Sequence, residues 1–408
     1  MRWFIFIAIY FLIDFYAYQA VRTISKNYWL AGLYFIVSIS VIIAMYYLLN
    51  TNGSTDFMKP PKNYFFGIFL VVFIPKLLLV IFMFGEDVMR FFTGLFFKFS
   101  ANESDFYLPS RRKFISTMAL GLAAIPFASL LYGMVRGKYN FKVLQYELEF
   151  DDLPEAFDGY TITQISDIHS GSFDNHDKIK YAVDLINEQQ SDTILFTGDL
   201  VNNVAEEMKE WKGLFSTLKA KDGVFSILGN HDYGDYVRWE NEADKIQNLN
   251  DLKNLQAEMG WDLLLNEYRF LEKGNDRIAL IGVENWGENG FKKAGDLNKA
   301  CEGVSQEDFK IVMSHDPSHW KSEVKNDDRN FHLTLSGHTH GMQFGIEIPG
   351  WIKWSPIKYR YENWAGIYEE QGRYINVNRG FGYLGYPGRV GIWPEISVIK
   401  LKKRSNVL

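Results

Sequence analysis

Residues 29–49 form an unbroken run of apolar, aromatic and small polar side chains in which no residue is charged. A run of this length matches the roughly 20 residues that an α-helix needs to cross a bilayer. Residues 114–135 are also uncharged, and residues 3–20 and 64–84 are largely apolar apart from Asp14 and Lys76 respectively. Buried helices of a soluble core would also be apolar, but four such runs so close together favour membrane spans. We therefore expect residues 1–136 to form an all-α transmembrane domain with about four helices.

Basic residues are distributed unevenly among the connections between these runs. Arg22 and Lys26 lie in the first connection, Lys59 and Lys62 in the second, and Arg90, Lys98, Arg111, Arg112 and Lys113 in the third. Because short cytoplasmic loops collect lysine and arginine, we expect the first and third connections inside. The fourth span then leads the rest of the chain outward, which predicts an integral membrane protein with an extracytoplasmic soluble domain.

A short motif before the fourth run agrees with this orientation. Ser110, Arg111, Arg112 and Lys113 precede an apolar stretch and resemble a twin-arginine export signal. An ordinary positively charged membrane anchor would carry the same residues, so both interpretations stay open.

Two ionisable residues, Asp14 and Lys76, fall inside predicted spans. Such groups are costly in a bilayer unless they are paired or close to water. If the first and third spans run in the same direction, the two side chains lie at similar depth and can pair. The alternative is that Lys76 extends to the membrane surface and that Asp14 lies near the interface.

From about Tyr139 the sequence changes to short apolar runs that alternate with helical stretches, a pattern typical of a layered α/β domain. We expect residues 139–408 to form this second domain. The net charge of -6 and the absence of a basic stripe interleaved with aromatic residues argue against nucleic acid as a partner. Cys301 is the sole cysteine, which excludes an internal disulfide and a cysteine-based zinc site.

Five of the apolar runs end at side chains that can bind metal ions. The predicted strands are residues 161–166, 193–197, 224–228, 310–314 and 333–336, and they are followed in turn by Asp167 and His169, by Asp199, by Asn230, His231 and Asp232, by His315, and by His338 and His340. Open α/β sheets place their sites at the carboxyl ends of strands, so these side chains are expected to converge. Glycines beside them allow tight turns and close backbone approach.

The residue types indicate the chemistry of this site. Imidazole and carboxylate together suit manganese, iron or zinc, and a carboxylate can bridge two cations. A pair of metal ions roughly 3.5 to 4 Å apart can hold a hydroxide and clamp a phosphoryl group. An isolated Asp-x-His or Gly-Asp is usually a turn or a surface pair, but five such motifs at strand ends predict a site for two divalent cations.

In this order, the five motifs resemble those of the calcineurin-like metallophosphoesterases over about residues 140–402. The resemblance implies an α/β, four-layer fold of two central mixed β-sheets flanked by helices, here preceded by the transmembrane domain. It also implies a bridging role for Asp199, a substrate-facing His231 that stabilises charge or protonates the leaving oxygen, and an Asp232 that orients the His231 imidazole. The implied ligands are Asp167, His169, Asp199 and His340 for one metal, and Asp199, Asn230, His315 and His338 for the other.

Further residues resemble the branch of membrane-attached bacterial phosphoesterases. They are Phe157, Asp158, Gly159 and Tyr160 before the first motif, Gly341, Met342 and Gln343 after the last, and Arg379, Gly380, Arg389, Pro394 and Glu395 in the tail. That branch usually has Gly-Gly-Gln after the final histidine, so Met342 departs from the pattern. The resemblance implies an enzyme of the bacterial cell membrane.

We therefore expect a phosphoric ester hydrolase that cleaves a phosphomonoester, phosphodiester or pyrophosphate bond at the membrane surface by attack of metal-bound hydroxide. Its partners would be the bilayer and a phosphorylated small-molecule or lipid-like substrate. We expect the aromatic residues within 351–368 to pack in the core or in loops. The alternative is that some of them face the bilayer and admit a lipid-like substrate. Two other hypotheses are a pyrophosphatase acting on a nucleotide-linked lipid precursor at the cytoplasmic face, and a membrane transporter or sensor with a regulatory phosphoesterase-like domain.

Overall fold

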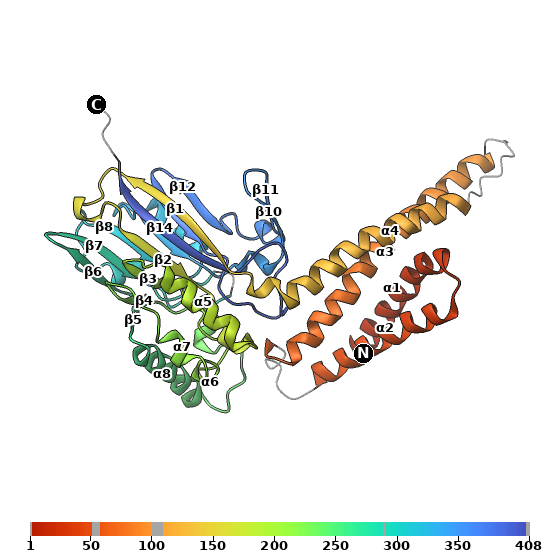
Figure 1. Ribbon diagram of the computed structural model, residues 1–408, viewed down its shortest axis with the longest axis horizontal. Helices are drawn as coiled ribbons and strands as arrows, with labels where there is room; N and C mark the ends of the chain where they lie inside the picture. Colours follow the sequence, from red (N-terminus) through yellow and green to blue (C-terminus); the bar gives the residue numbers. More distant parts are fainter. Residues whose placement is uncertain (1, 51–57, 100–108, 289, 405–408) are drawn as a thin grey trace. The chain divides into compact units, whose positions relative to one another are not determined.

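The computed structural model describes residues 2–50, 58–99, 109–288 and 290–404 (Figure 1). Its internal contacts divide the chain into two compact units. Most of residues 1–135 form the first unit, and residues 136–408 together with 58–60 form the second. The described part of the first unit is largely helical, whereas the second contains both helices and sheets.

The first unit consists of long apolar helices. These are α1 (Arg2–Ile24), α2 (Tyr28–Asn50), α3 (Lys62–Phe99) and α4 (Pro109–Val135). Within the described residues, all four are long and apolar enough to cross a membrane. Helix α3 continues through Pro75, and it lies side by side with α4 along much of its length (Figure 1).

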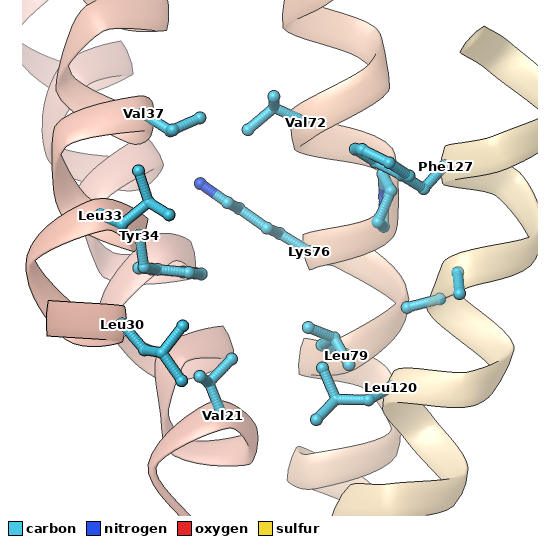
Figure 2. A pocket seen from close by; sticks show the side chains of 13 residues that line it. Val21, Leu30, Leu33, Tyr34, Val37, Val72, Lys76, Leu79, Leu120 and Phe127 are labelled. Carbon is cyan, nitrogen blue, oxygen red and sulfur yellow. The ribbon is translucent and has the colours of Figure 1, made fainter. Parts of the chain in front are cut away.

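Asp14 and Lys76, the two ionisable residues inside the predicted spans, pair with each other. Lys76 Nζ on α3 donates to Asp14 Oδ1 on α1 at 2.5 Å and also to Ser38 Oγ on α2. Both charged side chains are buried, and the Tyr34 ring centroid lies 4.7 Å from the ammonium group. The predicted pairing of Asp14 and Lys76 is confirmed. Figure 2 shows Lys76 extending into a mostly apolar cavity of about 450 Å³ that residues of all four helices line.

Two six-stranded sheets form the centre of the second unit. The first has the order β1-β14-β2-β3-β4-β5 and the second β12-β13-β9-β8-β7-β6. The strands of the first sheet are β1 (Lys142–Phe150), β14 (Glu395–Lys403), β2 (Thr161–Ile165), β3 (Thr193–Phe196), β4 (Val224–Ser226) and β5 (Trp261–Leu263). Those of the second are β12 (Gly366–Glu370), β13 (Arg373–Val377), β9 (Leu333–Ser336), β8 (Phe309–Met313), β7 (Asp276–Gly282) and β6 (Glu267–Lys273). Both sheets mix parallel and antiparallel pairs.

Helices cover the outer faces of the two sheets. They are α5 (His176–Glu188), α6 (Glu206–Lys209), α7 (Lys212–Phe215) and α8 (Glu242–Glu258) beside the first sheet, and α9 (Leu297–Ala300) and α10 (Ser318–Ser322) beside the second. A separate hairpin joins β10 (Ile346–Ile348) to β11 (Ile352–Trp354).

Side chains alternate between the two faces of each strand, and this alternation builds the layers. On β3, Ile194 and Phe196 pack against helices, whereas Leu195 packs between the sheets. On β8, Ile311 packs between the sheets, whereas Val312 faces the helices of the second sheet. The order of layers is helix, sheet, sheet, helix, so the predicted four-layer α/β fold after an all-α membrane domain is confirmed.

Candidate metal centre

The candidate ligands lie in the loops that follow five strands of the two sheets. Asp167 and His169 follow β2, Asp199 follows β3, Asn230 and His231 follow β4, His315 follows β8, and His338 and His340 follow β9. Strands β2, β3 and β4 belong to the first sheet and β8 and β9 to the second. The carboxyl ends of these strands lie at one edge, so loops from both sheets meet there.

Five of these residues have a left-handed backbone. The φ angles are 52° for Asp167, 48° for His169, 61° for Asp199, 71° for His338 and 50° for His340. Non-glycine residues rarely adopt this region, and each such residue costs about 1 to 3 kcal/mol. The surrounding fold therefore imposes a strained backbone at the positions from which the candidate ligands project.

The first group of ligand atoms joins the two sheets. His169 Nε2 lies 3.0 Å from His340 Nε2, which in turn lies 3.1 Å from Asp167 Oδ1. His169 Nε2 also lies 3.6 Å from Asp199 Oδ2. One carboxylate oxygen of Asp167 and one ring nitrogen each of His169 and His340 all lie within 4.8 Å of one another, close enough to hold one metal ion.

The second group shares Asp199 with the first. His315 Nε2 lies 3.2 Å from the same oxygen, Asp199 Oδ2, and Asp199, His315 and His338 form another compact set of ligand atoms. The other oxygen, Asp199 Oδ1, accepts a hydrogen bond from the His231 backbone N–H at 2.8 Å. Asp199 Oδ2 is therefore available to both groups.

The donor set fits two cations. Within each group, carboxylate oxygens and imidazole nitrogens converge, and an imidazole nitrogen without its proton is an acceptor. The buried Asn230 Oδ1 has no hydrogen-bond partner among the described residues, while Asn230 Nδ2 donates to Tyr236 Oη at 2.8 Å. Buried polar atoms normally have a partner, and a bound cation would supply one for these converging acceptors.

The surroundings of His338 and His169 favour the neutral imidazole, which is the form that binds a metal ion. Burial lowers the pKa of His338 to about 4 and holds the pKa of His169 well below its usual value, so both imidazoles are neutral. Burial alone would lower the pKa of His315, but the Asp199 carboxylate raises it to about 10. A cation is thus favoured beside Asp199, and metal binding would release the His315 proton.

Hydrogen bonds behind the ligands orient their imidazole rings. His315 Nδ1 donates to the Thr197 carbonyl at 2.7 Å, which leaves Nε2 as the ligand atom. His338 Nε2 lies 2.8 Å from Tyr361 Oη, which leaves Nδ1 for a metal ion. Sequence reasoning missed Tyr361 in this role, because nothing in its local sequence distinguishes it from the other aromatic residues nearby.

The structure corrects the role that the resemblance implied for Asp232. His231 Nδ1 lies 2.6 Å from the Asn202 carbonyl oxygen, so that carbonyl orients the imidazole. The Asp232 carboxylate instead accepts hydrogen bonds from the backbone N–H groups of Asp199 at 2.9 Å, Leu200 at 2.8 Å and Gly229 at 2.8 Å. The prediction that Asp232 orients His231 is wrong; Asp232 ties the loop after β4 to the loop after β3.

A cavity of about 190 Å³ opens over both groups. Asp199, Asn230, His231, His338 and His340 line its floor and walls, together with residues that sequence reasoning missed, namely Phe291, Ile357, Arg360, Tyr361 and Leu384. These additional residues come from three segments of the chain, at Phe291, at residues 357–361 and at Leu384. A substrate in this cavity would contact His231, both ligand groups and the one arginine among the lining residues.

Two family models match the chain. Residues 160–342 match the calcineurin-like phosphoesterase model, and residues 1–138 match the model of the transmembrane domain of probable calcineurin-like phosphoesterases.

Similar proteins occur in bacteria and in animals. An uncharacterized metallophosphoesterase of Bacillus subtilis, YkuE, is 29% identical over 299 residues, which cover 72% of this chain and 98% of that protein. A transmembrane protein with metallophosphoesterase domain from Danio rerio is 27% identical over 67% of this chain and 60% of its own length. Among solved structures, phosphopantetheinyl hydrolase from Mycobacterium tuberculosis has a TM-score of 0.33 and 12% identity, covering 54% of this chain and 89% of that chain.

The two family models and the two similar sequences agree with the five motifs and the two candidate metal groups. Residues 160–342 therefore belong to the calcineurin-like metallophosphoesterases, which are phosphoric ester hydrolases that use divalent metals, and residues 1–138 belong to the transmembrane domain of such proteins.

Proposed function

We propose that this protein hydrolyses a phosphomonoester, phosphodiester or pyrophosphate bond at the membrane surface, using two divalent ions of manganese, iron or zinc. The proposed ligands are Asp167, His169, Asp199 and His340 for one ion, and Asp199, Asn230, His315 and His338 for the other. The observation that supports this proposal most is the shared carboxylate oxygen, since Asp199 Oδ2 lies 3.6 Å from His169 Nε2 and 3.2 Å from His315 Nε2.

When bound, two such ions supply a water molecule that ionises near neutral pH and a positive clamp on phosphoryl oxygens. The chain's own groups act around that clamp. His231 lines the cavity, and because the Asn202 carbonyl occupies its Nδ1–H, its Nε2 is the atom left to meet the substrate. A protonated His231 would stabilise charge on the phosphoryl group or donate its proton to the leaving oxygen.

We further propose that the active site lies on the extracytoplasmic side of a bacterial cell membrane. Four helices are long and apolar enough to cross the bilayer, and an even number of crossings would leave the N-terminus and the catalytic domain on the same side. The basic residues of the first and third connections support an outer location for that side.

The proposal is tested on the purified full-length chain with water-soluble nitrophenyl phosphate mono- and diesters. Wild type should hydrolyse at least one of them, lose that activity to a chelator and regain it with manganese, iron or zinc. His231→Ala should keep its metal ions but lose turnover by about 100-fold or more, the usual contribution of a positioned acid or base. His176→Ala serves as the control, because His176 is exposed at the start of α5. Wild-type inactivity with both ions bound, or full activity of His231→Ala, would contradict the proposal.

A further inference from the structure

The β10–β11 hairpin exposes part of its apolar face, because Ile346 and Ile348 are exposed and Ile352 and Trp354 are half-buried. In this hairpin Ile346 pairs with Trp354 and Ile348 pairs with Ile352. Directly paired residues point to the same face of a two-stranded sheet, so these four apolar side chains share one face. Ile346 is 51% exposed and Ile348 is 42% exposed. A hairpin of a soluble domain normally buries such a face.

The polar face of the same hairpin is bound to the domain instead. Glu347 accepts two hydrogen bonds from Arg379, at 2.9 and 2.6 Å, and Lys353 Nζ donates to the Ala365 carbonyl. Arg379 is itself buried and donates to Glu395 at the start of β14 at 2.5 Å. A buried ion-pair network therefore fixes the hairpin with its apolar side outward.

Other exposed apolar residues lie close to the hairpin along the chain. Of the eight large apolar side chains that are exposed among the described residues of 136–404, six lie between residues 342 and 359. We call them the hairpin surface: Met342, Phe344, Ile346, Ile348, Trp351 and Tyr359. Trp351 and Tyr359 are 77% and 79% exposed. A single segment that carries most of the exposed large apolar side chains of the domain is a candidate interaction site.

The composition of the hairpin surface fits a bilayer. Tryptophan and tyrosine favour the layer between lipid headgroups and acyl chains. Lys358 and Arg360, both exposed, flank Tyr359 and can contact anionic headgroups. The membrane-spanning helices of the same chain keep the catalytic domain close to a bilayer, so this partner is always within reach.

The hairpin surface borders the candidate metal centre along the chain. Met342 follows the candidate ligand His340 by two residues, and Ile357, Arg360 and Tyr361 after β11 line the cavity over the metal groups. The cavity of about 190 Å³ is smaller than the roughly 300 to 1,000 Å³ of sites that enclose a whole small molecule. A phosphate headgroup fits such a cavity while the rest of a large substrate stays outside.

We propose that the hairpin surface inserts into the bilayer interface and that the active site takes its substrate, the phosphate ester of a membrane lipid, directly from that bilayer. This inference rests on the proposed phosphoesterase function. In the reaction, water adds to phosphorus, the bond from phosphorus to the lipid oxygen breaks, and that oxygen takes up a proton. The hydrocarbon chains stay in the bilayer throughout.

Insertion is tested by site-specific fluorescence in the full-length chain. Cys301, the sole cysteine, is buried, so a Cys301→Ala background allows one label at a chosen position. The label is placed through Trp351→Cys, or through Tyr181→Cys as a control on α5, where Tyr181 is 57% exposed. In phosphatidylcholine and phosphatidylglycerol vesicles with brominated acyl chains, the label at position 351 should be quenched and the label at 181 should not. Equal quenching at both positions overturns the inference.

The substrate class is tested by comparing two substrates in the same vesicles. Trp351→Ser and the double variant Ile348→Ser with Trp351→Ser should hydrolyse phosphatidic acid about tenfold more slowly than wild type, because interfacial apolar contacts are lost. Their hydrolysis of a soluble nitrophenyl phosphate should stay within about twofold of wild type, since neither residue lines the cavity. Ile246→Ser, on α8, is the matched exposed control.

The two proposals fail in different ways. If the hairpin variants affect both substrates equally, or affect neither, the lipid inference is overturned. The phosphoesterase function still stands in that case, provided that wild type hydrolyses the soluble ester. Wild-type inactivity toward the soluble ester would instead count against the phosphoesterase function itself.

Discussion

At the scale of single residues, the candidate metal centre depends on glycines that stand beside the ligands. A Cβ atom on Gly229 would lie 2.2 Å from Asp199 Oδ1, and one on Gly337 would lie 1.9 Å from Ser166 Oγ and 2.3 Å from Asp167 Oδ2. Such contacts are far shorter than any side chain tolerates. The motifs therefore contain glycine because neighbouring loops approach within contact distance there: two loops of the first sheet at Gly229, and one loop from each sheet at Gly337.

Gly337→Ala should consequently displace Asp167. A ligand shift of about 1 Å can cost about 100-fold in activity, so we expect a loss of at least that size together with reduced metal content. Gly213→Ala is the matched control, because a Cβ atom at Gly213, within α7, meets nothing within 4 Å. Nitrophenyl phosphate turnover and metal analysis of the two purified variants check this, and near wild-type activity of Gly337→Ala would refute the close packing described above.

At the scale of elements, the strands that lead into the site could be predicted because each ligand motif begins where an apolar run stops. The predicted strand 193–197 is observed as Thr193–Phe196, and the predicted 333–336 is observed as Leu333–Ser336. Similarly, the long apolar runs predicted the four long apolar helices, and the opposite charges of Asp14 and Lys76 predicted their pairing.

Features that depend on contacts between distant segments could not be derived from the residues alone. The last strand, β14, lies between β1 and β2. Strands β2 and β9 belong to different sheets, and only the family resemblance indicated that there are two sheets. Asn202 orients His231 through a backbone carbonyl, which carries no side-chain signal. The alternating pattern of β10 likewise does not reveal which face is buried, since Arg379 decides this from another part of the chain.

At the scale of the whole molecule, sidedness determines which substrates are accessible. We expect a reporter that is active only outside the cytoplasm to be active when fused to the C-terminus and inactive when fused after Lys26, in the first connection. A reporter that works only in the cytoplasm should give the opposite pattern. A cytoplasmic C-terminus would contradict the proposed orientation and would favour the alternative of a pyrophosphatase acting on a lipid precursor at the inner face.

The central claim is that one carboxylate, Asp199, holds two metal ions together with ligands from both sheets. Metal analysis of the purified full-length chain, after loading with manganese or zinc and removal of free ions, tests it most directly. We expect about two ions per wild-type chain, about one after His315→Ala, and almost none after Asp199→Ala, because that variant removes a ligand common to both sites. Two tightly bound ions in Asp199→Ala, or no bound ions in wild type, would contradict the claim.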